Sequence, residues 1–565
     1  MERLIGSPAR AAPAREAWHQ SRATAWWRHF TLPGAWVALV FACLSFTPSL
    51  LPRGGPFQGL VSGISAVIGY GLGVAGAWLW REFANRPPRA PSARAWRGYF
   101  GVAAVALAAS LVLGWHWQAS IRERMGMPHP GRAGYLFAPF IAALLFFLLI
   151  AAGRGLRALS HRLNTRLSRH VGPRAARATS GLAVATLTFL VLSGVLWDGL
   201  ISLADRTLAL QDTTTAEGVH PPRSPLRSGS PDSLVPWETL GRQGRSFVAQ
   251  GPSVEELSTF HGAPAKEPIR VYAGYASAPD AERRAELAVN DLERAGGFER
   301  DFLLVVTTTG SGWVVPESVE AFEFLTRGDS AIISMQYSHL WSWLSVLVDQ
   351  QRAREAGRAL FDAVYERWSR LPEDRRPKLF VFGESLGSYG GETAFSGERD
   401  LANRTHGALF VGPPQFNTLY REFTDQRDAG SPEVEPIYRE GRIVRFSRRP
   451  GEEISPTSAP WGDSRVLYLL HPSDPITWWS PQLLLRRPDW LREPRGDDVV
   501  DAMVWLPFVT FWQVTADLPL GMAVPPGYGH VYTGEHVDGW LALLRPEGWT
   551  GQKTARLRER LRPTP

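Results

Sequence analysis

Cysteine is almost absent from this chain: among its 565 residues there is one, Cys43. A single cysteine cannot form an intramolecular disulfide or supply a cysteine-based metal centre. The sequence also lacks an HExxH motif, an EF-hand loop and a Walker-type phosphate loop, and its thirteen histidines are scattered. There is no repeat of fixed period either. We therefore predict no metal ion and no other cofactor.

Long apolar runs are confined to the first part of the chain. Five stretches carry almost no charge, and each is roughly 17–23 residues long, which is the length that crosses a bilayer as a helix. They cover residues 35–51, 59–80, 98–117, 134–152 and 181–203. Five such stretches are hard to place in a soluble core, so we predict a membrane domain over 1–204 with five transmembrane helices.

The distribution of arginine predicts the orientation of this domain. Seventeen arginines lie in the N-terminal tail and in the loops after the second and fourth stretches, against four in the alternate loops. Because positively charged loops stay in the cytoplasm, five crossings put everything after about residue 204 outside the cytoplasmic membrane. The pI of 9.6 then reflects charge that faces anionic lipid. No basic patch interleaves with aromatic residues, so nucleic acid is not an expected partner.

Two regions follow the membrane domain. Residues 205–236 are rich in proline, serine, threonine and glycine, which predicts a flexible linker because such a segment buries too little surface to order itself. From 237 to 565, apolar strands alternate with helical patterns, which predicts an α/β domain with a mostly parallel sheet. Strands are expected at 268–274, 302–307, 330–336, 378–382, 406–411 and 466–471.

One predicted strand runs directly into a short glycine-containing motif. The apolar residues 378–382 are followed by Gly383-Glu-Ser-Leu-Gly387 and then by small residues. This is the strand–turn–helix context of a G-x-S-x-G nucleophile elbow, in which a tight turn projects the serine above the sheet. Ser385 is therefore our candidate nucleophile. The alternative is an ordinary serine in a glycine-rich strand–helix turn.

The partners of a nucleophilic serine follow it in the order that this fold requires. Such a serine needs an imidazole to take its proton and a carboxylate to orient that imidazole. Asp474 lies in the turn after the strand 466–471, at the carboxyl edge of the sheet, although it could simply cap that turn. Two histidines remain beyond it. His530 lies in a glycine-rich loop and is preferred over His536, which falls at the start of a predicted surface helix.

Backbone N–H groups for an oxyanion hole are expected at two places. The first is Leu386, the residue after the candidate nucleophile. The second is the glycine-rich loop after the strand 302–307, where Gly310, Ser311 and Gly312 are candidates. The same loop could equally be a simple turn between a strand and a helix.

Six strings together resemble the membrane-anchored alpha/beta-hydrolase family 9. They are Ser49-Leu-Leu-Pro-Arg53, residues 240–248, residues 269–279, residues 308–313, residues 336–344 and Gly383–Gly387. The resemblance covers both the apolar stretches and the C-terminal domain. It implies an alpha/beta-hydrolase fold with Ser385 as nucleophile and is consistent with Asp474 and His530, but it implies no particular substrate.

The substrate must be inferred from the surroundings of the site. The stretch 502–512 is apolar but too short to span a membrane, and it lies between the candidate acid and the candidate histidine, where a cap is often inserted. A mobile apolar cap near 480–524 would admit acyl chains and exclude water, which predicts a lipid or other apolar ester as substrate. The alternative is that these apolar residues are simply core.

Three functions are compatible with this sequence. A serine esterase or lipase at the outer face of the membrane is predicted first, on the strength of the complete set of Ser385, Asp474 and His530. An acyltransferase would use the same acyl-enzyme but pass the acyl group to an envelope lipid or sugar. A membrane scaffold without activity would need none of the three residues.

Overall fold

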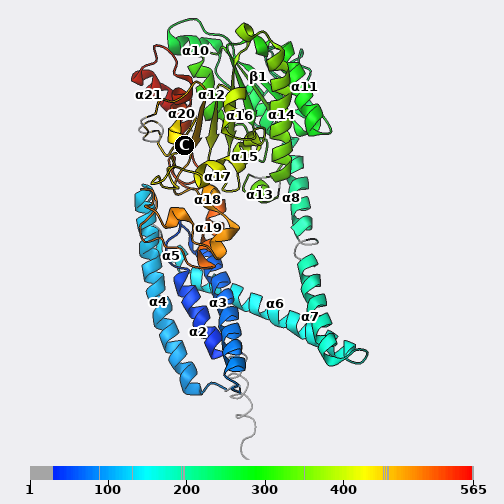
Figure 1. Cartoon of the computed structure of the whole chain (residues 1–565), viewed down its shortest axis with the longest axis vertical. Helices are drawn as coiled ribbons and strands as arrows, with labels where there is room; N and C mark the ends of the chain where they lie inside the picture. The colour runs from blue at the N-terminus through cyan, green and yellow to red at the C-terminus, as the bar shows by residue number, and fades with distance from the viewer. Residues whose placement is uncertain are drawn as a thin grey trace, which may run out of the picture. The chain divides into compact units, whose positions relative to one another are not determined.

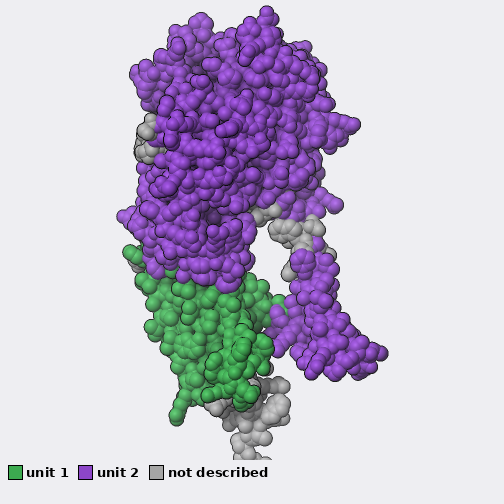
Figure 2. Space-filling model, in the orientation of Figure 1, with its two compact units in different colours: residues 1–47, 54–116, 131–152 green, residues 48–53, 117–130, 153–565 purple. Residues whose placement is uncertain are grey.

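The structure is a computed structural model that describes residues 30–562, except 88–89, 130, 192–193, 195–196, 341, 349, 450, 452–453, 455–456 and 458. It divides into two compact units (Figure 2). Unit 1 takes in the described residues up to Thr47 together with Gly54–His116 and Gly131–Ala152. Unit 2 takes in Gly153 to the C-terminus and also two short segments, Pro48–Arg53 and Trp117–Pro130.

Three helices in the described part of the chain are long and apolar enough to cross a membrane: α3 Gly55–Phe83, α4 Ala93–Arg124 and α6 Ala138–Leu167 (Figure 1). They correspond to the second, third and fourth predicted spans. The first predicted span appears as α2 Leu32–Leu44, whose 13 residues reach only about 20 Å. The fifth is divided between α7 Pro173–Leu190 and α8 Trp197–Asp212, with residues outside the described part between them. These two spans stay predictions.

Small residues allow the apolar helices of unit 1 to approach one another closely. A Cβ atom on Gly69 of α3 would lie 2.7 Å from the carbonyl oxygen of Val37 in α2, and one on Gly59 would lie 2.7 Å from that of Ala138 in α6. Contacts this short exclude any side chain. Close backbone approach through glycine is how helices pack in lipid, where the hydrophobic effect does not drive them together.

The α/β domain is built on a seven-stranded sheet in which every pairing is parallel, as predicted. The strand order is β1-β3-β2-β4-β5-β7-β6. The strands are β1 Ile269–Ala273, β2 Phe302–Thr307, β3 Ser330–Met335, β4 Lys378–Glu384, β5 Gly407–Val411, β6 Val444–Ser447 and β7 Arg465–Leu469. The edge strand β6 was not predicted, because its four residues include Arg445 and carry too little apolar pattern.

Helices bury both faces of this sheet. Alternate residues of β2 point to opposite sides: Val305 joins the core beneath α11 Ala281–Arg294 and α14 Gln350–Arg370, whereas Leu304 joins the core beneath α12 Pro316–Leu325 and α20 Glu535–Leu544. The other helices are α5 Arg132–Tyr135, α9 Gly241–Ala249, α10 Val254–His261, α13 Ser342–Val348, α15 Leu386–Glu392, α16 Glu398–Arg404, α17 Thr418–Asp425, α18 Pro475–Trp478, α19 Val509–Asp517 and α21 Gly551–Arg560.

The structure differs from the predicted flexible linker over 205–236. Helix α8 covers its beginning, and residues 226–228 run alongside the edge strand β1, where Ser228 N donates to Arg270 O over 3.0 Å. The buried carboxylate of Asp291 accepts hydrogen bonds from Ser228 Oγ at 2.6 Å and from Leu234 N at 2.8 Å. Composition predicted disorder because it does not reveal that another element satisfies the polar groups of the segment.

Replacing Asp291 should release this segment. Asp291→Ala removes a fully buried acceptor of several hydrogen bonds, each of which is worth about 1.5–3 kcal/mol when one partner is charged. We expect limited proteolysis of the full chain to cut within 219–236 much faster than in wild type. Glu286→Ala, on an exposed position of the same helix α11, is the matched control. Equal cleavage of both variants would contradict this role of Asp291.

Candidate active site

Ser385 occupies a strained turn between β4 and α15. Its backbone has φ 55° and ψ −128°, a conformation that residues with a side chain rarely adopt. The turn is held by the neighbouring strand, because Ser385 N donates to Val411 O at the end of β5 over 2.8 Å. This is the backbone geometry that a G-x-S-x-G motif after a strand predicts.

The two glycines of the motif make this turn sterically possible. A Cβ atom on Gly383 would lie 2.3 Å from the carbonyl oxygen of Gly387, and one on Gly387 would lie 2.4 Å from that of Thr307. Both distances are far below van der Waals contact with backbone atoms that cannot move aside. The start of α15 therefore packs directly against β4 and β2.

Asp474 and His530 form a buried pair. His530 Nδ1 lies 2.7 Å from Asp474 Oδ2, and that oxygen also accepts a hydrogen bond from Tyr532 Oη over 2.8 Å. The other oxygen of Asp474 accepts from Ile476 N over 2.9 Å and so caps α18. The capping and pairing interpretations of Asp474 therefore both hold. A carboxylate fixed in this way determines the orientation of the imidazole that it binds.

The imidazole of His530 lies over the end of β5. A Cβ atom on Gly412 would be 2.6 Å from His530 Cε1, and Gly412 directly follows Val411, the residue that binds the backbone of Ser385. His530 Nε2 is buried and makes no hydrogen bond with any residue that the structure describes. Nδ1 is thus occupied by Asp474, while Nε2 is the nitrogen left to accept a proton.

The surroundings of His530 favour its charged form. Burial alone would lower the pKa of the imidazole, but the charge of Asp474, its hydrogen bond and the charge of Glu384 outweigh burial, so the pKa lies above its ordinary value of 6.5. Glu384 directly precedes Ser385 in the chain. Its electrostatic effect on His530 is consistent with an imidazole that lies close to the elbow.

The other histidines considered have different partners. His536 Nε2 lies 2.8 Å from Glu384 Oε2 and both groups are buried, so His536 pairs with the residue before Ser385 rather than with Asp474. His471 stacks on Tyr532, with ring centroids 4.1 Å apart, and its Nδ1 contacts Gly529 O over 2.9 Å. Sequence reasoning missed Tyr532, whose only signal was its position two residues after His530.

The residues after β2 that contact the elbow lie earlier in the chain than the predicted ones. A Cβ atom on Gly387 would lie 2.9 Å from Thr308 O, so Thr307 and Thr308 are the residues next to the elbow. Gly312 is a correction to the prediction, because its N–H donates to Thr309 O over 3.0 Å and is not available to a substrate. Gly310 packs towards Ser345 and Leu340. Which N–H groups act was not predictable, because their direction depends on the turn.

The position of Leu386 fits the prediction that its N–H group would bind an oxyanion. It is the first residue of α15, and the first N–H groups of a helix have no partner within that helix. An N–H group in this position, directly after a nucleophile, points towards the place where an oxyanion would form. Gly310 and Ser311 stay predictions for the second donor.

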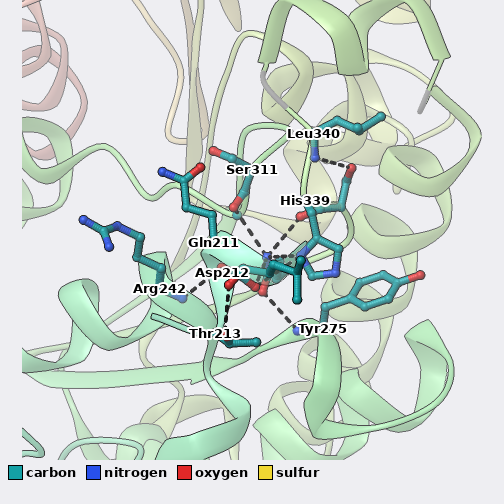
Figure 3. Close-up of polar contacts among 12 residues, drawn as sticks. Gln211, Asp212, Thr213, Arg242, Tyr275, Ser311, His339 and Leu340 are labelled. Atoms are coloured by element: carbon teal, nitrogen blue, oxygen red, sulfur yellow. Dashed lines mark hydrogen bonds and ion pairs between the residues drawn. The ribbon is translucent and has the colours of Figure 1, made fainter. Parts of the chain in front are cut away.

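A polar cluster around Asp212 contacts the loop that follows β2 (Figure 3). Asp212, at the end of α8, accepts hydrogen bonds from Arg242 N over 2.8 Å and Gln336 Nε2 over 3.0 Å, and lies 3.2 Å from His339 Nδ1. Burial would raise the pKa of Asp212, but these hydrogen bonds lower it below its ordinary value. Gln336 in turn accepts from Tyr275 N over 3.1 Å. The cluster thus joins the chain segments that follow β1 and β3.

Comparison with known proteins identifies the family of this chain. The model of the alpha/beta-hydrolase family matches residues 269–557, and that of the N-terminus of the same family matches residues 46–252. The chain belongs to the alpha/beta-hydrolase family. This alpha/beta-hydrolase has no match among curated proteins or solved structures. Membership of the family supports a hydrolase-type function, and the family match covers Ser385, Asp474 and His530.

The pH dependence of this alpha/beta-hydrolase should report on the Asp474–His530 pair. If neutral His530 is the base, the rate at which Ser385 reacts falls as the pH drops through the pKa of the imidazole, which lies above 6.5. Asp474→Asn should shift this acidic limb to lower pH and slow the reaction by about 10³–10⁴-fold, because the imidazole loses its orienting charge. The measurement is the pH–rate profile of both proteins. A rate within tenfold of wild type would show that another residue is the acid.

Proposed function

We propose that the chain is a membrane-anchored serine hydrolase, an esterase or lipase, that cleaves an apolar or lipid ester at the outer face of the cytoplasmic membrane. The observation that carries the proposal is the strained backbone of Ser385 beside the buried Asp474–His530 pair. A strained serine turn costs about 1–3 kcal/mol and persists only where the surrounding structure holds it. Ordinary strand–helix turns have no need of it.

The proposed reaction proceeds in two steps through an acyl-enzyme. Ser385 Oγ attacks the ester carbonyl while His530 Nε2 takes its proton. The negative charge on the oxyanion is stabilised by Leu386 N–H and by the N–H of Gly310 or Ser311. His530 then gives the proton to the leaving alcohol. Water attacks the acyl-enzyme in the second step, again through His530, and releases the acid and free Ser385.

The set of chain segments that forms unit 2 supports the proposed orientation. Segments 48–53 and 117–130 belong to the same compact unit as the α/β domain. The first covers the end of the first predicted span and the start of the loop after it, and the second is an arginine-poor loop predicted to lie outside. Parts that pack together lie on the same side of a membrane, so an even number of crossings must separate segment 117–130 from the α/β domain. If α6 is one crossing, the stretch 181–203 supplies the second, in agreement with five spans.

The burial of the site and the surface around it support an apolar substrate. Ser385 is only 2 % exposed, so a substrate reaches it only after part of the surrounding structure moves. Leu485, Val504 and Met522, in the predicted cap region, are 71 %, 43 % and 59 % exposed. Trp505 Nε1 and Phe508 N donate hydrogen bonds to the carbonyls of residues 483 and 484. These bonds join the segment that carries Val504 to the one that carries Leu485. Exposed apolar side chains of this kind fit contact with lipid.

Part of the predicted cap belongs to the core instead. Met503, Val509 and Val514 are almost completely buried, and Val514 packs in the same core as the sheet residues. Deletion of this stretch would therefore damage the fold. The cap hypothesis is better restricted to the exposed side chains of residues 480–524, which can be changed without opening a cavity.

A fluorophosphonate probe tests the proposed nucleophile directly. We expect the full chain, purified in detergent, to be labelled at Ser385 and the Ser385→Ala variant to remain unlabelled, because the probe reacts only with an activated serine. Ser334→Ala is the control: Ser334 is a buried serine of β3 that donates to Val306 O, and its loss should leave labelling in place. Absence of labelling in folded wild type would contradict a serine hydrolase with this nucleophile.

The substrate class can be tested on the exposed apolar side chains. The triple variant Leu485→Ser, Val504→Ser, Met522→Ser should slow hydrolysis of long-chain esters in vesicles by about tenfold or more, since less apolar surface contacts the lipid. Hydrolysis of a soluble short-chain ester should change by less than twofold. Leu234→Ser with Val254→Ser, also exposed, is the matched control. Equal losses on both substrates would contradict the lipid assignment.

A further inference from the structure

The short segment Pro48–Arg53 belongs to the catalytic unit although it lies between α2 and α3 in the chain. Its leucines are fully enclosed: Leu50 is 1 % and Leu51 0 % exposed, and both join the core that includes residues of the central sheet. An exposed loop between two membrane helices would normally be polar and mobile. The burial of this segment indicates that it has a specific partner.

That partner is the end of α19. Ser49 Oγ and the backbone N–H groups of Leu50 and Leu51 donate to the carboxylate of Asp517, and Arg53 Nε lies 3.8 Å from Asp517 Oδ1. The side chains of Arg53 and Asp517 are both 0 % exposed. Burying a carboxylate is costly unless it is paired and hydrogen-bonded, and Asp517 receives both from this segment, so we infer that the segment docks in one register.

The docked segment lies against the residues that carry His530. Gly521, four residues after Asp517, accepts the backbone N–H of His530 at its carbonyl oxygen over 2.9 Å. On the other side, a Cβ atom on Gly529 would lie 3.4 Å from Leu51 Cδ2, which is ordinary van der Waals contact. The segment 48–53 thus lies next to Gly529 through Leu51 and binds Asp517, four residues before Gly521.

A second segment from the N-terminal region contacts the same loop. Arg124, the last residue of α4, accepts a hydrogen bond from Tyr528 Oη at its carbonyl oxygen over 2.9 Å, and its guanidinium donates to Asp497 O over 2.9 Å. The two segments are also joined to one another, because Arg53 N donates to Gln118 Oε1 over 2.6 Å. The loop that ends in His530 is therefore held at two consecutive residues, Tyr528 and Gly529.

We propose that segments 48–53 and 117–130 are positioning elements that clamp the His530 loop, so that chain between the apolar helices completes the active site. This inference rests on the proposed function, since it assumes that His530 is the base. Leu51 and Tyr528 act through the backbone of the loop and do not contact the reacting atoms.

The clamp predicts that a small loss of packing far from Ser385 in the sequence changes its reactivity. Leu51→Ala in the full chain should slow fluorophosphonate labelling of the folded protein by about tenfold or more. It should also move the acidic limb of the pH–rate profile towards 6.5, because a looser His530 loses part of its interaction with Asp474. Leu257→Ala, equally buried but in the other core beneath α12, is the matched control. It creates the same kind of cavity and should alter neither rate nor profile.

Tyr528→Phe provides a variant that leaves packing intact. It removes only the hydrogen bond to Arg124 O, and we expect labelling to be about threefold to tenfold slower with the limb shifted in the same direction. Wild-type labelling that is lost in Ser385→Ala establishes the nucleophile independently of the clamp. If that holds and folded Leu51→Ala and Tyr528→Phe both keep the wild-type rate and profile, the clamp is wrong while the hydrolase stands. If Leu257→Ala loses reactivity equally, the effect is general loosening and the clamp is also wrong.

Discussion

The strained backbone of Ser385 is the constraint on which the arrangement of the site depends. A residue with a side chain at φ 55° is stable only if its neighbours leave it no alternative, and here a parallel sheet provides them. The hydrogen bond from Ser385 to Val411 ties the turn to β5, and the packing of Gly387 on Thr307 ties it to β2. Because β2, β4, β5 and β7 run in the same direction, the segments that follow them meet at one edge. Ser385, the loop after β2 and Asp474 come together for that reason.

Buried charge then determines which side chains can act at this edge. Asp474 is enclosed and accepts hydrogen bonds from a backbone amide, a tyrosine and a histidine, so its negative charge is compensated only in this one arrangement. His536 and Glu384 form a second buried pair beside it. The two pairs give the two histidines different partners. The imidazole of His530 lies over the end of β5, whereas that of His536 binds Glu384, the residue before the candidate nucleophile. Exchange between them would leave one carboxylate buried without a partner.

Local and long-range features differed in how well the sequence predicted them. The elbow, the parallel sheet and the position of Asp474 after β7 were predictable, because each depends on a contiguous strand and the turn that follows it. His530 was predicted from its order in the chain and its glycine-rich loop. Gly312 was placed wrongly, because the direction of an N–H group depends on a turn whose hydrogen bonds the sequence does not reveal. The ordering of residues 226–235 and the docking of Pro48–Arg53 were missed for a different reason. Their partners, Asp291 and Asp517, lie far away in the chain, and composition carries no information about such pairs.

Several of the contacts that the sequence did not predict have one feature in common: each joins the chain next to an apolar helix to a loop of the α/β domain. Asp212 ends α8, the helix that contains the end of the last apolar stretch, and it binds the segment after β3. Leu51 follows one apolar helix and Arg124 ends another, and both contact the loop of His530. A hydrolase anchored only for location would need a flexible tether, with no buried contacts of this kind. Instead, chain that leaves apolar helices contacts the segment after β3 and the loop of His530. On the proposed clamp, the segments that follow α2 and end α4 therefore hold the loop of the proposed base, so they would belong to the catalytic apparatus.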